Sequence, residues 1–126
     1  MDDVVIVGGG IIGAATAYFL SKEGRKVKVI ERDPTYKSAS FPLSLGGFRR
    51  QFFQKENILL GKFAKDFIFQ IPELLKTEKN PNPTASMVSN GYLLMFGKDE
   101  AEEQYRALEN HKECDAGTKN IKGSEL

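Results

Sequence analysis

The sequence predicts an α/β fold organised around one parallel βαβ unit at the amino end of the chain. Three observations indicate this unit. An unbroken run of β-branched residues at positions 4–7 is followed by the glycine-rich segment 8–13 and then by an apolar stretch of helical length. A second strand-like run, Val27-Lys28-Val29-Ile30, is followed by the acidic Glu31. This order of strand, glycine turn, helix, strand and acid is the one that a dinucleotide-binding unit requires.

The glycines of the turn are expected to have separate tasks. Gly8 permits the tight turn out of the first strand, and Gly10 has no side chain to hold a pyrophosphate away from the backbone. Gly13 lets the helix lie close against the strands. The free N–H groups of the first helical turn, near Ile11 and Ile12, can then point at phosphate oxygens, and the helix dipole favours the anion.

The rest of the unit agrees with this interpretation. The first strand is expected to be buried on both faces, because such runs are typical of parallel sheets covered by helices. Gly24 stands where a helix C-cap is wanted. Glu31 follows Gly13 by 18 positions, near the spacing of about 20 at which an acid reaches a ribose hydroxyl. An acid there would repel a 2′-phosphate, which argues against NADP.

Length and charge limit the possible classes of protein. A chain of 126 residues is one ordinary domain in length. A formal net charge of +1 attracts neither nucleic acid nor acidic lipid, so we expect neither as a partner. No run approaches the roughly 18 apolar residues of a membrane span, so no transmembrane segment is expected.

Single cysteine and histidine residues carry little functional signal. Cys114 is the only cysteine, which excludes an internal disulfide and favours an inert thiol. His111 is the only histidine, and we expect no metal site. Met1 and Asp2 lead directly towards the first strand without an arginine-rich leader. Either the protein needs no cleaved targeting sequence at this end, or the chain begins after one.

The segment 35–47 is predicted to be a loop. It is rich in serine and contains paired glycines. The hydroxyls of Ser40 and Ser44 and the amides of Gly46 and Gly47 could bind a pyrophosphate already held by the first turn. A mobile surface loop would use serine and glycine equally well. Composition alone does not decide between these alternatives.

A helix is predicted over residues 56–75, because apolar residues recur there at helical spacing. Its apolar face is expected to pack in the core. Pro72 is expected to kink this helix or to begin a new one.

After a break at residues 79–84, the pattern predicts a β-hairpin over residues 87–96 with its turn at Asn90-Gly91. Asp99 with Glu102 is expected to cap a last helix that runs to about His111.

Together these segments resemble the amino-terminal third of FAD-dependent oxidoreductases of the D-amino-acid oxidase and sarcosine oxidase superfamily. The resemblance is carried by residues 5–13, 29–33, 44–49 and 91–94. Within the superfamily, the chain is most similar to a mitochondrial branch linked to complex I assembly, and next to the sarcosine and dimethylglycine dehydrogenases. This narrower similarity is carried by residues 31–36, 43–47, 51–52 and 56–58.

The resemblance implies a Rossmann-like FAD-binding segment over residues 1–82. It also implies the beginning of an antiparallel substrate domain, left incomplete, over residues 83–126. FAD is the cofactor implied. Carried over residue by residue, the pyrophosphate would be held by Gly8, Gly10, Ile12 and Gly13. Glu31 would hold the adenosine ribose, and Arg32 would lie by the adenine.

The same resemblance implies that the path from the pyrophosphate to the flavin is lined by Ser40, Ser44, Gly46 and Gly47. In the family the position after Ser40 is commonly Thr-Gly. This chain has Phe41 and Pro42 there, so a hydroxyl and the freedom of a glycine are absent at that point.

The activity implied is oxidation of a small amine or amino acid, with hydride transfer to FAD. In this family the catalytic residues lie largely beyond the length of this chain, so no catalytic residue is assigned. Arg49 is interpreted either as an exposed arginine or as a contact to the flavin or the substrate. We expect that these 126 residues alone do not turn over substrate, and whether they hold FAD tightly is left open.

Two alternatives remain at this point. One is an assembly or binding protein in which FAD is structural, with respiratory-complex assembly partners. The other is an NAD-binding module, which shares the first fingerprint but does not account for residues 40–47. A mitochondrial location follows from the resemblance alone, and a cytoplasmic location is the alternative.

Overall fold

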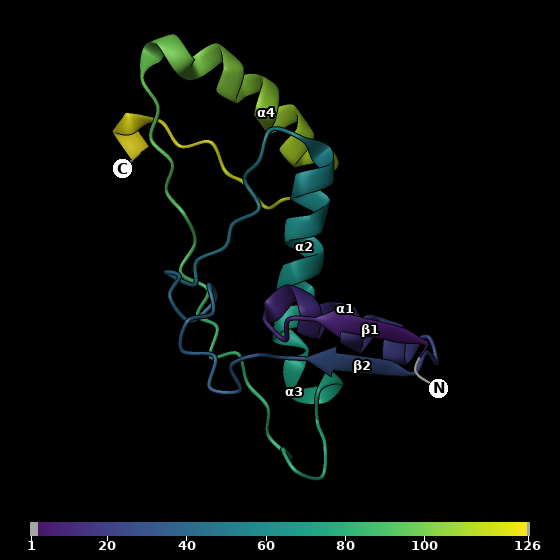
Figure 1. Cartoon of the computed structure of the whole chain (residues 1–126). Helices are drawn as coiled ribbons and strands as arrows, with labels where there is room; N and C mark the ends of the chain where they lie inside the picture. Colours follow the sequence, from purple (N-terminus) through teal and green to yellow (C-terminus); the bar gives the residue numbers. More distant parts are fainter. Residues whose placement is uncertain (1–2, 126) are drawn as a thin grey trace. The chain divides into compact units, whose positions relative to one another are not determined.

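The computed structural model describes residues 3–125. Met1, Asp2 and Leu126 lie outside the described residues, and so does the expected lead-in from Met1 and Asp2. Contacts divide the chain into two compact units, Met1–Gly47 and Phe48–Leu126. The helices and strands are β1 (Val4–Val7), α1 (Ile11–Lys22), β2 (Val27–Ile30), α2 (Lys55–Phe69), α3 (Ile71–Leu74) and α4 (Ala101–Glu113), with 3-10 turns at Lys98–Glu100 and Gly123–Glu125 (Figure 1).

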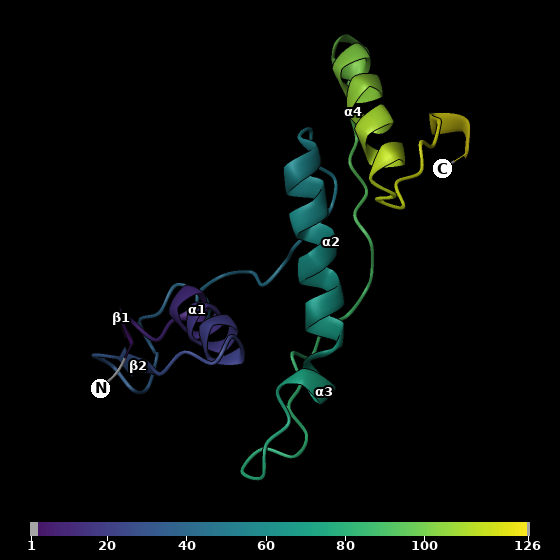
Figure 2. The same ribbon diagram turned by 90° about the vertical axis from the view of Figure 1, so that its right-hand side faces the viewer.

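The first unit is the βαβ unit that the sequence predicts. β1 and β2 pair in parallel, with Val4 opposite Val27 and Val7 opposite Ile30. α1 connects the two strands and contacts both of them (Figure 2). The carboxyl ends of the two strands therefore lie side by side, next to the amino end of α1.

The end of α1 confirms the predicted role of Gly24. This residue has a φ of +80°. Its N–H donates to the Ser21 carbonyl at 3.0 Å, and the Arg25 N–H donates to the Leu20 carbonyl at 3.0 Å. These two bonds form a Schellman motif, which satisfies carbonyl groups at the end of the helix. The chain then turns directly into β2.

The expectation that the first strand is buried on both faces is wrong for this structure. Val5 is 53% exposed and Val7 is 86% exposed. Among the described residues, β1 has a paired neighbour on one edge only. Burial of both faces requires helices on each side of the sheet, and α1 is the one helix among the residues of this unit that the structure describes.

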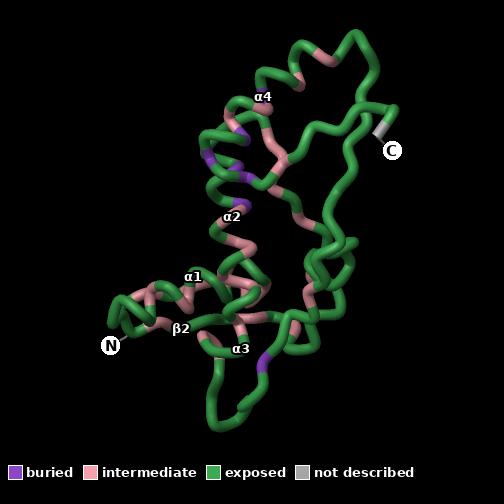
Figure 3. The backbone as a smooth tube through the Cα atoms, turned by 180° about the vertical axis from the view of Figure 1, so that it is seen from behind, coloured by how far each residue is buried: buried purple, intermediate pink, exposed green. Residues whose placement is uncertain are grey.

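The second unit is built from α2, α3 and α4. Pro72 lies in the first turn of α3, as predicted for a proline that begins a new helical segment. Figure 3 shows most of the buried residues gathered where α2 meets the end of α4, with one more in the loop after α3. Ile58 is fully buried at the junction of α2 and α4, in a small cluster with Cys114 and Ala116.

The expectation of a buried apolar face on α2 is only partly met. Ile58 and Gly61 are buried, whereas Leu60 is 65% exposed and Phe63 is 55% exposed. Lys55, at the beginning of α2, and Lys62, at its middle, donate hydrogen bonds to the end of α4, at Glu113 and Cys114. Much of the apolar stripe therefore stays uncovered.

The predicted hairpin is not formed, because residues 83–97 contain no helix or strand. The expected type I′ turn needs a positive φ at both central residues. Gly91 has a φ of +77°, but the φ of Asn90 is not positive. A two-stranded hairpin without a packed face is marginal in water. The exposed apolar side chains of this segment include Val88, Leu93 and Met95. The wider antiparallel substrate domain stays a prediction.

The start of α4 also differs from the prediction. The N–H of Gly97 donates to Glu100 Oε2 at 3.1 Å, and a 3-10 turn precedes the helix. The capping contact is therefore made by Gly97 and Glu100 rather than by Asp99 and Glu102.

Candidate functional site

The first unit contains a cavity of about 520 Å³ at the carboxyl ends of its two strands. Open parallel sheets bind nucleotides at this edge. The lining comes from the end of β1, the glycine turn, the first turns of α1 and the loop after β2. It includes seven of the predicted site residues, namely Gly8, Gly10, Ile12, Gly13, Glu31, Arg32 and Ser40.

The glycine turn has the geometry that its three tasks demand. Gly8 has a φ of +99°, and its N–H donates to the Ile30 carbonyl at 2.8 Å. A Cβ on Gly13 would lie 1.9 Å from the Gly8 carbonyl oxygen, so only glycine allows this close approach. A Cβ on Gly10 would meet nothing within 4 Å. The backbone at Gly10 is therefore open to a ligand.

The amino end of α1 offers unpaired donors. The first backbone bond of the helix runs from the Ala14 N–H to the Gly10 carbonyl, at 2.8 Å. Gly10 is the N-cap and provides no side-chain bond, and the first turn holds no acidic residue. Within the described chain, the N–H groups of Ile11, Ile12 and Gly13 are thus left without an acceptor. An anion at this position would be stabilised by them and by the helix dipole.

Glu31 lies against the glycine turn. Its Oε2 accepts the Gly9 N–H at 2.6 Å, and its Oε1 accepts the Asp33 N–H at 2.8 Å. The Asp33 N–H, followed by the Gly9 N–H, lowers the pKa of the Glu31 carboxyl. Each carboxylate oxygen keeps further lone pairs. The ionised group can therefore still accept hydrogen bonds from a ligand.

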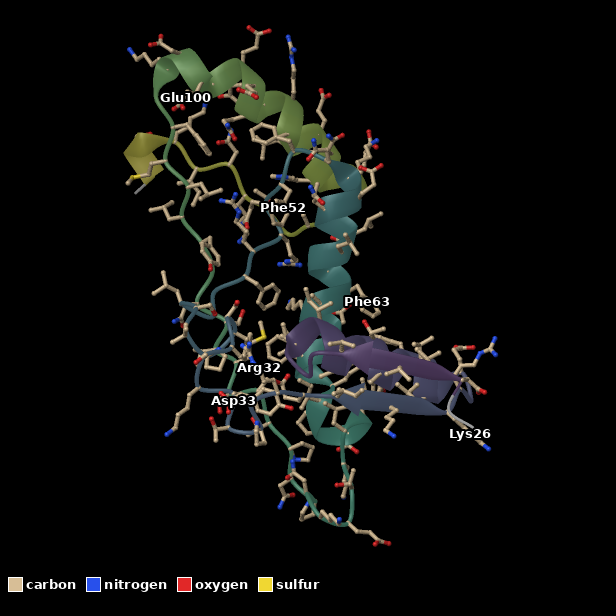
Figure 4. The ribbon with its side chains drawn as sticks, viewed as in Figure 1. Lys26, Arg32, Asp33, Phe52, Phe63 and Glu100 are labelled. Carbon is tan, nitrogen blue, oxygen red and sulfur yellow. The ribbon has the colours of Figure 1, made fainter. Side chains whose placement is uncertain are left out.

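The loop after β2 contributes Asp33, which the sequence did not single out as a site residue, beside the predicted Arg32. Figure 4 shows Arg32 and Asp33 at the carboxyl end of β2. Asp33 Oδ1 accepts the Thr35 hydroxyl at 2.6 Å and the Thr35 N–H at 2.9 Å, and this pair lowers the pKa of Asp33. The sequence Asp33-Pro34-Thr35, shortly after Glu31, is a turn signal that could have indicated this contact in advance. Other lining residues without a prediction include Thr16, Tyr36, Ser38 and Phe41.

Three predicted residues do not reach this cavity, namely Ser44, Gly46 and Gly47. The Ser44 hydroxyl instead donates to the Phe41 carbonyl at 2.8 Å and accepts the Gly46 N–H at 3.2 Å. Their role beside the flavin stays a prediction.

Arg49, His111 and Cys114 belong to the second unit. The Arg49 guanidinium lies 5.2 Å from the ring centre of Phe52. His111 is buried with its Nε2 at 2.8 Å from the Phe52 carbonyl oxygen, and Cys114 is buried in the same cluster. In this unit the three residues have packing contacts, and no role at the cavity is assigned to them.

The sequence matches the profile of the family described as "FAD dependent oxidoreductase" over residues 3–123. The chain belongs to this family. Members of the family are FAD-dependent, so the dinucleotide is FAD rather than NAD.

Relatives within the FAD-dependent oxidoreductase family are much longer than this chain. "FAD-dependent oxidoreductase domain-containing protein 1" of Xenopus laevis is 42% identical over 122 residues, which are 90% of this chain and 24% of that protein. The Bos taurus protein of the same name is 39% identical over 79% of this chain and 21% of its own length. A Drosophila melanogaster homolog is 32% identical over 90% of this chain and 22% of its own length. The chain therefore spans about a quarter of the relatives it matches.

No solved structure matches the chain. No helix among residues 3–125 has both the length and the apolar character needed to cross a membrane.

The residues of the cavity fit the family's cofactor. The open backbone at Gly10 and the free N–H groups of Ile11 and Ile12 suit the pyrophosphate of FAD. The ionised Glu31 suits the free ribose hydroxyls of its adenosine half.

Proposed function

We propose that this chain is the FAD-binding amino-terminal part of a flavin-dependent oxidoreductase that oxidises a small amine or amino acid. One observation supports the binding role above the others. An open glycine turn, an uncapped helix end and an ionised carboxylate line one cavity in a chain of an FAD-dependent family. When bound, FAD supplies the acceptor for a hydride from the substrate.

The chain's own residues bind and orient the adenosine diphosphate half of the cofactor. Gly8, Gly10, Ile12 and Gly13 would hold the pyrophosphate, as the geometry of the turn and the free N–H groups support. Glu31 would accept a ribose hydroxyl while it keeps its two backbone bonds.

The residues proposed to lie by the adenine and towards the flavin have less structural support than those at the pyrophosphate and the ribose. Arg32 and Ser40 line the cavity and would lie by the adenine and along the path to the flavin, respectively. Ser44, Gly46 and Gly47 would line that path as well, after their loop rearranges around the cofactor.

The amine class of substrate is supported by the resemblance of residues 5–13, 29–33, 44–49 and 91–94 to the D-amino-acid oxidase and sarcosine oxidase superfamily. No residue of this chain is assigned to the substrate. The test is reduction of bound flavin by primary and secondary amines under anaerobic conditions, in a longer protein that contains this sequence. Absence of reduction with every amine would overturn this part of the proposal.

A second candidate is an assembly protein of the mitochondrion, linked to respiratory complex I, in which FAD is structural. Its support is the similarity of residues 31–36 and 43–47 to that branch. Co-purification of complex I subunits with the longer protein, together with amine-inert flavin, is the result expected of this candidate.

The binding role is tested by titrating the purified 126-residue chain with FAD and, separately, with NAD. We expect saturable quenching of flavin fluorescence and the flavin absorption bands in the protein fraction. Saturable NAD binding without any FAD binding would contradict the proposal.

A further inference from the structure

Tyr36 holds a left-handed backbone conformation in the loop beside the cavity. Its φ is +55°, a region that bulky side chains rarely adopt. Hydrogen bonds on both sides hold it there, because its N–H donates to the Asp33 carbonyl at 3.1 Å and its carbonyl accepts the Ala39 N–H at 3.0 Å. Strained residues of this kind persist where the surroundings impose them, and they cluster at ligand sites.

The side chain of Tyr36 reaches the glycine turn. A Cβ built on Gly9 would lie 2.8 Å from the Tyr36 hydroxyl oxygen and 3.4 Å from Glu31 Oε2. The dinucleotide fingerprint leaves this middle position free, so phosphate binding does not require glycine there. The missing side chain of Gly9 instead makes room for the phenol next to the carboxylate.

The phenol is available to a ligand. Tyr36 lines the cavity and is 39% exposed. Among the described residues its hydroxyl has no hydrogen-bond partner, and a phenol can donate one bond and accept another. Its hydroxyl and the Glu31 carboxylate therefore face the same small space in front of Gly9.

We propose that the Tyr36 hydroxyl binds the ribose of the adenosine half of FAD, beside Glu31, an inference that rests on the proposed function. The ribose carries neighbouring hydroxyls, of which one can donate to Glu31 while another accepts from Tyr36. Gly9 and Tyr36 act as a coupled pair, because the glycine provides the space that the phenol occupies. The pyrophosphate is bound without either of them.

The test titrates the 126-residue chain with ADP, which carries the ribose, and with inorganic pyrophosphate, which does not. We expect Tyr36→Phe to lower the affinity for ADP about fivefold, which is the effect of one neutral hydrogen bond. The affinity for pyrophosphate should stay unchanged. Tyr36→Asn removes the phenol but tolerates the left-handed conformation. We expect it to weaken ADP at least as much as Tyr36→Phe does, with no fall in the midpoint of thermal unfolding.

A double-mutant cycle tests the coupling with Gly9. Gly9→Ala alone should weaken ADP, because the new methyl group displaces the phenol. In the Tyr36→Phe background, which lacks the oxygen that the methyl would meet, Gly9→Ala should change ADP affinity by less than about twofold.

The outcomes separate this inference from the proposed function. Equal ADP affinity of the wild-type chain and Tyr36→Phe would overturn the role of Tyr36 and leave the FAD site standing. A Tyr36→Asn chain that loses ADP, pyrophosphate and thermal stability together would show a structural role and would also overturn it. A wild-type chain that binds neither FAD nor ADP would overturn the proposed function, and the inference with it.

Discussion

Gly10 and Gly13 are both glycines of the fingerprint, yet they serve different purposes. At Gly13 a side chain would collide with backbone, because the Gly8 carbonyl oxygen lies 1.9 Å from the Cβ position. At Gly10 the φ is −60°, which any residue adopts, and the Cβ position is open. Gly13 is therefore needed to fold the unit, and Gly10 is needed to admit the ligand.

We predict that Gly13→Ala lowers the free energy of unfolding by about 3 kcal/mol, since the clash is with backbone that cannot move aside. Gly10→Ala should change it by less than about 0.5 kcal/mol and should weaken ADP binding at least tenfold. Denaturant unfolding followed by circular dichroism measures the first effect and calorimetry the second. Equal destabilisation by the two substitutions would contradict the separation of roles.

Glu31 makes the site sensitive to acid. Its pKa is held below the ordinary value of 4.5 by the Asp33 and Gly9 N–H groups. A carboxyl with a lowered pKa contributes stability that is complete above its ordinary pKa and is lost as the pH falls through the lowered one. The bonds that join Glu31 to the glycine turn are therefore intact at neutral pH.

We predict that FAD affinity and thermal stability are constant from pH 7 to about pH 5 and then fall as Glu31 takes up a proton. Glu31→Gln should weaken ADP about tenfold at pH 7, because a charge-assisted hydrogen bond is lost, and should flatten the fall at low pH. The pKa of Asp33 is also lowered. Protonation of Asp33 should therefore leave a smaller fall in stability at low pH in Glu31→Gln, and adding Asp33→Asn should remove it. An unchanged pH profile in Glu31→Gln would contradict the assignment.

At the scale of elements, α2 and α4 are joined mainly by bonds to backbone carbonyls. Asn110 Nδ2 donates to the Phe53 carbonyl at 2.7 Å, and Lys62 Nζ donates to the Cys114 carbonyl at 2.6 Å. The ion pair of Lys55 with Glu113 is half exposed and contributes little. The apolar share of the junction therefore depends on Ile58, which is fully buried.

We predict that Ile58→Ala lowers the free energy of unfolding of the second unit by about 2–4 kcal/mol, through lost burial and the cavity left behind. The matched control is Leu60→Ala on the same helix, where the side chain is 65% exposed, with an expected cost below about 1 kcal/mol. Loss of helical circular dichroism with denaturant measures both. Equal costs would show that the junction is not the core of this unit.

At the scale of the whole molecule, both units carry exposed apolar side chains. Val7 and Ile12 are 86% and 81% exposed in the first unit, and Val88 and Met95 are 74% and 79% exposed in the second. The relatives that the chain matches are about four times as long. Exposed apolar surface of this kind favours association.

We predict that the 126-residue chain associates reversibly at concentrations of tens of micromolar and binds a hydrophobic dye such as ANS. Val88→Ser should reduce both signals, and Lys79→Ser, a polar exposed position, should leave them unchanged. Sedimentation velocity across a concentration series measures the association. A strictly monomeric chain without dye binding would contradict the prediction.

The βαβ unit could be predicted because its signals are local. The bounds of β1, α1 and β2, the turn at Gly8 and the C-cap at Gly24 all follow from spacing over a few residues. The hairpin at residues 87–96 has similar local signals and yet does not form. Strand pairing depends on a packed face, which the turn residues at Asn90-Gly91 do not provide.

By itself, the sequence determined the elements of the candidate nucleotide site, because glycine, β-branched and acidic residues act through local backbone geometry, and its resemblance to known proteins indicated the FAD-dependent family. The tertiary structure alone decided that Glu31 bonds to Gly9, 22 positions away, and that the phenol of Tyr36 lies beside them. It also decided which apolar residues are buried. Contacts between distant positions depend on how the chain folds back on itself, and no periodicity in the sequence records that path.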